Sequence, residues 1–197
     1  MGIMEHIILA SESKRRLEFF RLLNLPFTCI PSNVDESFDP EMEASAVVKE
    51  LAVRKVKKVL ESLKDEALWV CGADTLITLD GKFYGKPENR NDAANMLRKF
   101  QGRTHEVTSG LALYNGRKKA FDCRSVSSLV TFAPLSEEEI QWYLDSGEWQ
   151  GVAGSYMIQG LASCFVTGIN GSFSSIVGLP LRDFYVMLRE NGYSYGA

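Results

Sequence analysis

The chain alternates short apolar runs with longer amphipathic stretches, a pattern that predicts strands and helices mixed in one fold. Its central feature is the apolar run 67–71, typical of a strand buried on both faces, at whose end lies Asp74. The next segment, 76–84, predicts a tight hairpin that turns at Asp80-Gly81 and leads to Lys86. One hairpin is thus predicted to hold an acid and a lysine on rigid elements, which suits a metal-bound polyphosphate. A capped turn at Asp74 and a solvated Lys86 are the alternative.

The same patterns predict further elements on both sides of this hairpin. Helices are expected in five segments: from the N-cap Ser13 to about Leu23, over 44–63, from an N-cap at Asn91 or Asp92 to Gly102, from a capping box of Ser136 and Glu139 to Gly147, and over 181–191. Strands are expected at 6–10, 27–30 and 103–113, on the return from Asn115-Gly116 to about Phe132, and at 161–169.

The first predicted helix starts with the cations Lys14, Arg15 and Arg16, preceded by Ser11 and Ser13. Cations at this end oppose the helix dipole, at a cost of a few tenths to about 1 kcal/mol each. An anion held by the free N–H groups, the hydroxyls and the guanidinium groups would offset this cost, so the segment predicts a phosphate site. Side chains that extend into water are the alternative.

Asp35 and Glu36 form an acidic pair between the second strand and the long helix. Paired carboxylates together with substrate phosphates are what magnesium or manganese requires, so the pair is a candidate metal site, with a solvated loop as the alternative. The polar face of the long helix carries five cations, one of which would reach a phosphate if it lay near a cleft: Lys49, Arg54, Lys55, Lys57 and Lys58.

Two known phosphate chemistries are excluded at the central hairpin. The interval between Gly81 and Gly85 is one residue short for a P-loop, and Pro87 stands where that motif needs Ser or Thr. A phosphatase that forms an aspartyl phosphate would need a second Asp two residues after Asp74, where the chain has Leu76.

Composition narrows the class of protein. With 197 residues, 45% of them hydrophobic, the chain is expected to form a single domain over 1–197. No run approaches the roughly twenty apolar residues that cross a bilayer, and the start lacks a secretory profile, so we expect a cytoplasmic protein without a membrane partner. The net charge of −3 argues against a nucleic-acid partner. Four separated cysteines predict buried free thiols rather than disulfides or a zinc site: Cys29, Cys71, Cys123 and Cys164.

The segment 151–160 is a candidate for contact with a nucleobase. Its three glycines allow close backbone approach, and Gln159 offers both a donor and an acceptor to a base edge. A structural glutamine is the alternative.

Short motifs spread over nearly the whole chain resemble those of the Maf nucleotide pyrophosphatases, and they occur in the order found in that family. They are Leu9-Ala10-Ser11-Glu12-Ser13-Lys14-Arg15-Arg16, Val34-Asp35-Glu36, Gly72-Ala73-Asp74-Thr75, Gly85-Lys86-Pro87, Gly102-Arg103-Thr104-His105, Ala153-Gly154-Ser155-Tyr156 with Ile158-Gln159-Gly160, and Gly178-Leu179-Pro180. Each motif is weak alone, but together they are highly specific.

The resemblance implies an α/β fold of the Maf and ITPase-like type, with an elongated mixed sheet flanked by helices, two lobes around a central cleft and usually a homodimer. It also implies hydrolysis of a nucleoside triphosphate between the α and β phosphates with a divalent cation, Mg²⁺ or Mn²⁺, giving a monophosphate and pyrophosphate. Asp74 would be the general base and would share metal binding with Asp35 and Glu36. The substrate would contact a larger set: Ser11, Arg15, Arg16, Lys55, Thr75, Lys86 and Gln159.

In the branch of the family that acts on dTTP and UTP, specificity goes with an Arg, a Thr and a Gln, which match Arg15, Thr75 and Gln159. Pyrimidine nucleotides, modified ones included, are therefore the expected substrates. The chain departs from the family at Lys14, commonly Pro, which adds a cation, and at Val152, often Lys, which removes one. Two alternatives stay open: a non-catalytic nucleotide-sensing or cell-division-regulating module, and a pyrophosphatase for modified purines such as 7-methyl-GTP.

Overall fold

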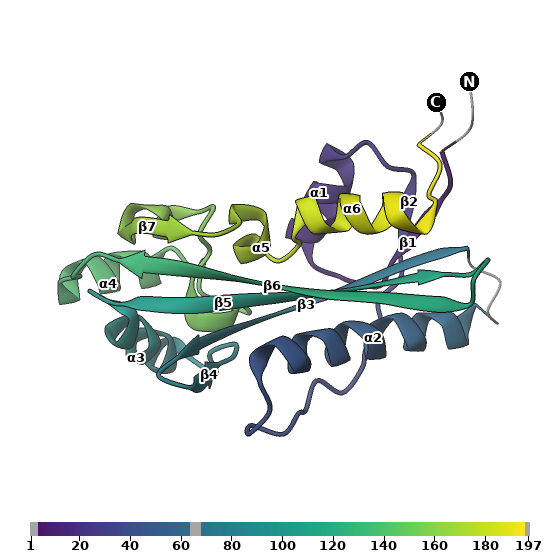
Figure 1. Ribbon diagram of the computed structural model, residues 1–197. Coiled ribbons are helices and arrows are strands. Elements are labelled where there is room, and N and C mark those ends of the chain that lie inside the picture. Colours follow the sequence, from purple (N-terminus) through teal and green to yellow (C-terminus); the bar gives the residue numbers. More distant parts are fainter. Residues whose placement is uncertain (1–3, 64–67, 196–197) are drawn as a thin grey trace. The chain divides into compact units, whose positions relative to one another are not determined.

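The computed structural model describes residues 4–63 and 68–195 as a mixed α/β fold (Figure 1). The elements, in chain order, are β1 (Ile7–Leu9), α1 (Lys14–Leu22), β2 (Phe27–Cys29), α2 (Ala44–Ser62), β3 (Trp69–Leu79), β4 (Lys82–Tyr84), α3 (Arg90–Phe100), β5 (Thr104–Asn115), β6 (Ala120–Phe132), α4 (Glu137–Asp145), the 3₁₀ turns η1 (Ala153–Ser155) and η2 (Leu161–Phe165), β7 (Val166–Asn170), α5 (Phe173–Val177) and α6 (Leu181–Asn191). The seven strands form one sheet in the order β2-β1-β3-β5-β6-β7, with β4 paired to β3. Strand β1 is parallel to both neighbours, whereas β4 and β7 are antiparallel to theirs. The predicted mixed sheet flanked by helices is confirmed.

The chain divides into two compact units. Unit 1 comprises Met1–Asp74, Ser109–Val126 and Gly178–Ala197, and unit 2 comprises Thr75–Thr108 and Ser127–Val177. The long strands β3, β5 and β6 contribute residues to both. The single domain over 1–197 and the cleft between two lobes stay predictions.

In unit 1 the sheet is covered on both faces, with α2 on one side and α1 and α6 on the other (Figure 1). Successive residues of β3 point to opposite faces, so Trp69 and Cys71 pack with Phe20 of α1 and Phe184 of α6, whereas Val70 packs under α2. The buried strand that the sequence predicted is confirmed from Trp69 onward. The prediction was wrong at Leu68, which is 46% exposed, and Ala67 lies outside the described part of the chain.

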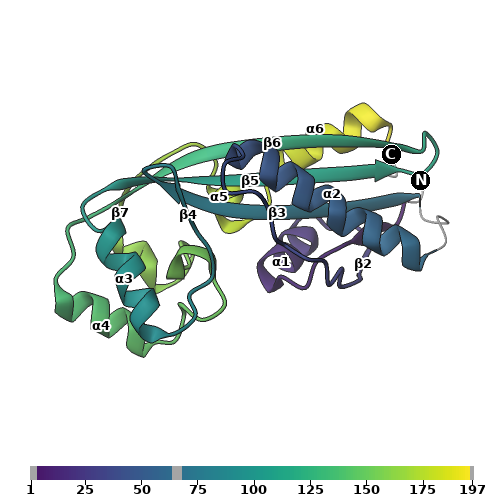
Figure 2. The same cartoon turned by 90° about the horizontal axis from the view of Figure 1, so that it is seen from below.

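Helix α2 lies across β3 and β5, as the view from below shows (Figure 2), and two glycines allow its close approach. A Cβ at Gly110 of β5 would lie 2.3 Å from the carbonyl oxygen of Val48. A Cβ at Gly72 of β3 would lie 2.6 Å from the carbonyl oxygen of Ala52. Because these neighbours are backbone atoms, only glycine permits the observed contact of helix and sheet.

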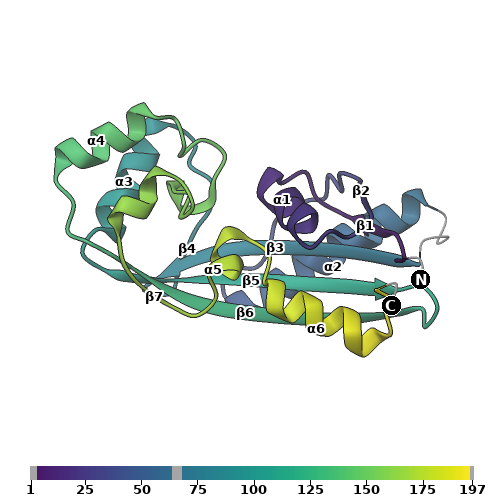
Figure 3. The same ribbon diagram turned by 90° about the horizontal axis from the view of Figure 1, so that it is seen from above.

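Unit 2 has an aromatic core beneath α3 and α4, which lie side by side (Figure 3). The ring of His105 stacks on Phe100 with centroids 4.5 Å apart, and its Nε2 lies 2.7 Å from the hydroxyl of Tyr156. His105 is only 1% exposed, and burial lowers its pKa from 6.5 to about 4. Within the described residues its Nδ1 has no hydrogen-bond partner. This histidine is therefore held neutral inside the core.

The predicted caps and turns are partly correct. The capping box of Ser136 and Glu139 is confirmed, as is the Asp80-Gly81 turn, where both residues have positive φ. The N-cap of α3 was wrongly predicted, because the side chain of Asn89 accepts from the N–H of Asp92 and starts the helix earlier.

Two strand predictions were also wrong. The strand that was expected to end before Asp74 continues to Leu79, so Asp74 lies in mid-strand. The expected strand over 161–169 starts only at Val166, since the N–H of Leu161 donates to Glu148 and the preceding residues form the turn η2.

The cysteines are free, as predicted, but not all are buried. Cys71 is buried, and burial raises its pKa to about 12. Cys29 is half-buried, whereas Cys123 of unit 1 and Cys164 of unit 2 are exposed, which corrects the prediction of four buried thiols.

Candidate active site

Asp74 faces α2 because it lies an even number of residues after Val70, on the same side of β3. Its Oδ1 accepts a hydrogen bond from Nζ of Lys55 at 2.5 Å. Both residues are 7% exposed. A buried charge without a partner is costly, and the contact between these two opposite charges offsets part of the cost of burying them.

Glu36 completes a three-residue charge cluster. Its Oε1 lies 2.7 Å from Nζ of Lys55, so one ammonium group contacts two carboxylates. Lys55 was predicted to lie on the polar face of its helix, and this is wrong. It lies three residues after Ala52 and four before Val59, both of which are fully buried or nearly so, and it therefore points to the sheet.

Arg16 is anchored beside this cluster in unit 1. Its Nε donates to the carbonyl of Gly178 at 2.8 Å, and its Nη1 donates to Oγ of Ser11 at 3.3 Å. Burial lowers the pKa of the Arg16 guanidinium, and the negative charge of Asp74 is the largest influence in the opposite direction. A guanidinium remains charged at neutral pH, so Arg16 brings a fixed positive charge close to Asp74.

The cationic start of α1 is as predicted. The helix begins at Lys14 after the N-cap Ser13, whose side chain makes no capping bond, and its first turn contains no acid. The N–H of Ser13 donates to Oγ of Ser11. Burial, followed by the charge of Arg16, lowers the pKa of Arg15. Anion binding at this helix end stays a prediction. The absence of a side-chain cap and of an acid from the first turn of α1 is compatible with it.

Asp35 is oriented differently from Glu36. Its carboxylate accepts from the N–H of Ser37 at 2.9 Å and from the Ser37 hydroxyl at 2.6 Å, and these bonds lower the pKa of Asp35. Across residues 4–63 and 68–195, no three His, Cys, Asp or Glu side chains gather in a way that would hold a metal ion.

The donor set nevertheless fits a divalent cation bound together with substrate. Glu36 and Asp74 each place an oxygen within 2.7 Å of the same ammonium nitrogen, so two carboxylates converge on one cation. Mg²⁺ is commonly held by one or two carboxylates plus substrate phosphates. The metal site that was predicted at Asp35, Glu36 and Asp74 stays a prediction.

The other three candidates belong to unit 2. Thr75 is half-buried in β3, Lys86 is exposed after β4, and Gln159 is exposed between η1 and η2. The N–H of Gly154 donates to the carbonyl of Gly85, which ties the loop before Lys86 to η1. Their role toward a substrate stays a prediction.

In the sequence, Gly178 was noted only as part of the motif Gly178-Leu179-Pro180. In the structure its carbonyl accepts a hydrogen bond from Nε of the half-buried Arg16. Every residue has a backbone carbonyl, so the residue type at position 178 could not indicate this contact.

Comparison with known proteins gives a consistent result. The sequence model of the family described as Maf-like protein matches residues 6–191. The chain is 40% identical over 190 residues to the dTTP/UTP pyrophosphatase of Symbiobacterium thermophilum, covering 96% of each chain. It is 43% identical over 189 residues to that of Hahella chejuensis, and 42% identical over 186 residues to that of Escherichia coli O157:H7. Both matches cover 94% of this chain and 92% of the relative.

Proposed function

Because the chain belongs to the Maf family, we propose that it is a nucleoside triphosphate pyrophosphatase that hydrolyses dTTP and UTP between the α and β phosphates. The products would be the nucleoside monophosphate and pyrophosphate. Relatives that carry this activity in their names are 38–43% identical and match almost end to end. The observation that carries the proposal is the buried Asp74, paired with Lys55 and lying within the electrostatic influence of Arg16.

Asp74 would act as the general base on the attacking water. Its Oδ1 is bound by Lys55, so the second carboxylate oxygen would accept the proton while the ammonium holds the side chain in one orientation. Attack on the α-phosphorus would release pyrophosphate, whose developing charge requires cations near it. Arg15, Arg16 and Lys86 are proposed to supply them, with Ser11 as a further phosphate ligand.

Glu36 and Asp74 would hold a divalent cation, Mg²⁺ or Mn²⁺, and Asp35 belongs to the same proposed set. When bound, the ion would neutralise phosphate charge and help orient the triphosphate. Residues of the chain position the charged groups: Lys55 contacts both carboxylates, and the carbonyl of Gly178 holds Arg16 in place.

Base preference is proposed to depend on Arg15, Thr75 and Gln159, which favours pyrimidine nucleotides. The exposed amide of Gln159 offers a donor and an acceptor, as reading a base edge requires. A preference for modified purines, and a nucleotide-sensing module that binds without turnover, are the competing proposals.

The deciding experiment measures pyrophosphate release by the purified chain from dTTP, UTP, CTP and 7-methyl-GTP, each with and without Mn²⁺. The proposal expects release from dTTP and UTP that depends on the added cation. Tight binding of dTTP without product would favour the sensing module. Turnover confined to 7-methyl-GTP would favour the purine enzyme.

The proposal also covers the localisation and the oligomeric state of the protein. Among the helices of the described residues, none combines the length and the hydropathy that a membrane-spanning helix needs. We propose a cytoplasmic homodimer without a nucleic-acid partner, on the basis of the family likeness and the net charge of −3. Sedimentation of the purified chain at several concentrations tests the dimer.

A further inference from the structure

The segment 30–43, between β2 and α2, carries Glu36 to its place beside Lys55 without regular secondary structure. Such a segment needs specific contacts to present a carboxylate in one position, since its backbone is not fixed by a helix or a sheet. Glu36 is itself exposed, so burial does not fix it either. Contacts with the main chain around Glu36 therefore decide whether its carboxylate reaches Lys55.

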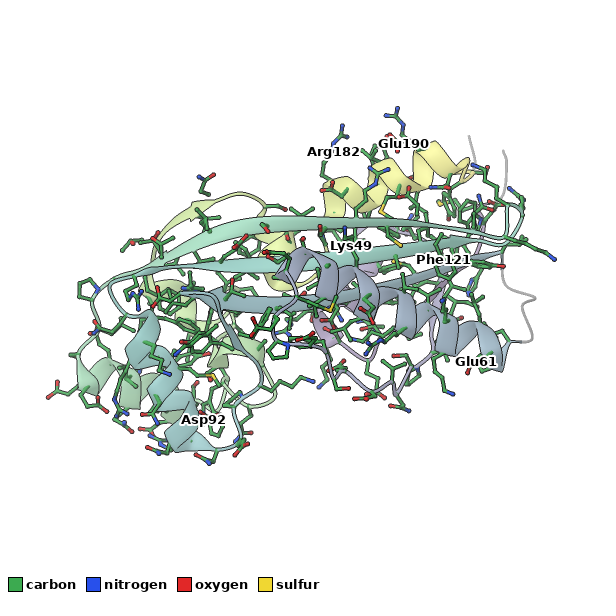
Figure 4. All side chains as sticks on the ribbon, turned by 60° about the horizontal axis from the view of Figure 1, so that its bottom comes forward. Lys49, Glu61, Asp92, Phe121, Arg182 and Glu190 are labelled. Carbon is green, nitrogen blue, oxygen red and sulfur yellow. The ribbon has the colours of Figure 1, made fainter. Side chains whose placement is uncertain are left out.

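Arg54 contacts the main chain on both sides of Glu36. Its Nη1 donates to the carbonyl of Ser37 at 2.7 Å and lies 3.4 Å from the carbonyl of Asp35. Its Nη2 pairs with Glu50, one helical turn earlier on α2, which fixes the guanidinium plane. Figure 4 marks this helix by Lys49 and Glu61, on either side of Arg54 in the sequence.

Two consecutive residues of α2 thus hold the same short piece of chain. Arg54 contacts backbone carbonyls before and after Glu36, and Lys55 contacts its side chain. The planar guanidinium carries several donors in a fixed arrangement, which a lysine at this position would lack.

Arg54 contacts the segment through hydrogen bonds at the border of a pocket. An open pocket of about 460 Å³ lies between the segment and α2, and its lining includes Asn33, Val34, Arg54 and Lys57. Apolar packing holds the start of the segment, where Ile30 lies against the cluster that includes Val56 of α2. Hydrogen bonds from Arg54 hold the segment at residues 35 and 37.

We infer that Arg54 is a positioning residue for the proposed reaction: it fixes the main chain of residues 35–37 so that Glu36 shares the ammonium of Lys55 with Asp74. Only the expected effect of Arg54 on kcat rests on the proposed function. The position of the segment itself does not depend on catalysis.

The kinetic test is a double-mutant cycle of Arg54→Gln and Glu36→Gln, with pyrophosphate release from dTTP as the readout. If Arg54 acts through Glu36, Arg54→Gln should lower kcat about tenfold or more in the wild-type chain but less than twofold in the Glu36→Gln chain. Equal losses in both backgrounds would overturn the inference. Lys57→Gln, from the same helix and the same pocket, is the matched control and should leave kcat within twofold.

A second readout separates failure of this inference from failure of the proposed function. Hydrogen exchange of the amides of residues 33–38 should be at least several-fold faster in Arg54→Gln than in Lys57→Gln, whether or not the chain hydrolyses dTTP. Unchanged exchange in Arg54→Gln would overturn the inference. A wild-type chain that releases no pyrophosphate, with faster exchange in Arg54→Gln, would overturn the function and leave the positioning role supported.

Discussion

The ammonium of Lys55 lies 2.5 Å from Oδ1 of Asp74, and both side chains are buried. Replacing Lys55 by Met would leave the carboxylate of Asp74 buried without this cation. Removing one partner of a buried ion pair costs about 3–5 kcal/mol. We expect the free energy of unfolding of Lys55→Met to fall by about that amount in a urea titration.

The control for this prediction is the same substitution in an Asp74→Asn chain, where no buried charge is left at position 74. The loss should then be clearly smaller. A loss of equal size in both chains would mean that packing, and not the ion pair, is responsible.

Asp74→Asn keeps the size and shape of the side chain but removes its ability to accept a proton. Loss of a general base typically lowers turnover by about 10²–10⁴-fold. We therefore expect kcat for dTTP to fall within that range while the circular dichroism spectrum stays native. Turnover close to that of the wild type would remove Asp74 from the role of base.

Lys86→Ala is expected to weaken substrate binding, because the ammonium is proposed to contact phosphate. Loss of a charge-assisted hydrogen bond of about 1.5–3 kcal/mol corresponds to roughly a 10–100-fold rise in KM for dTTP. Steady-state kinetics measures it. Lys82→Ala removes an exposed cation of β4 and serves as the control, with KM expected to stay unchanged.

The burial of His105 is expected to lower the free energy of unfolding at acid pH. Burial lowers its pKa from 6.5 to about 4, so the unfolded chain binds a proton more readily than the folded one. The stabilisation is therefore complete above about pH 6.5 and is lost as the pH falls toward 4, by up to roughly 3 kcal/mol. Urea titrations at pH 7 and pH 4.5 measure the loss. In His105→Gln, which does not titrate, the difference between the two pH values should be smaller by most of that amount.

Gly110→Ala is expected to destabilise the chain. The new methyl group would lie 2.3 Å from the carbonyl oxygen of Val48 and would force α2 away from β5. Overpacking of this kind costs about 1–3 kcal/mol. Thermal unfolding measures it, and Gly85→Ala is the control, because a Cβ there meets nothing within 4 Å. Equal melting temperatures for the two variants would contradict the close contact.

Local signals in the sequence were sufficient for several elements. The capping box at Ser136, the turn at Asp80-Gly81 and the helix after Ser13 depend on neighbouring residues, and the structure contains all three. The exception at Asn89 is also local, since either that residue or its near neighbours can cap the same helix.

Long-range contacts explain the failures. Lys55 follows the spacing of the buried stripe of α2, but its charge suggested the polar face. Its burial is acceptable because the carboxylate of Asp74, on strand β3, pairs with it. For the same reason a strand continues through Asp74, which the sequence alone favours as a strand end. The turn at Leu161 depends on Glu148, thirteen residues earlier, which no local pattern indicates.

The placement of the thiols has a practical use. Cys123 and Cys164 are exposed, one in each unit, whereas Cys71 is buried with a raised pKa and will react slowly with maleimides. With Cys29 replaced by Ser, the chain offers two natural attachment points for a donor and an acceptor dye. Fluorescence energy transfer between them would report the separation of the two units before and after a nucleotide is added.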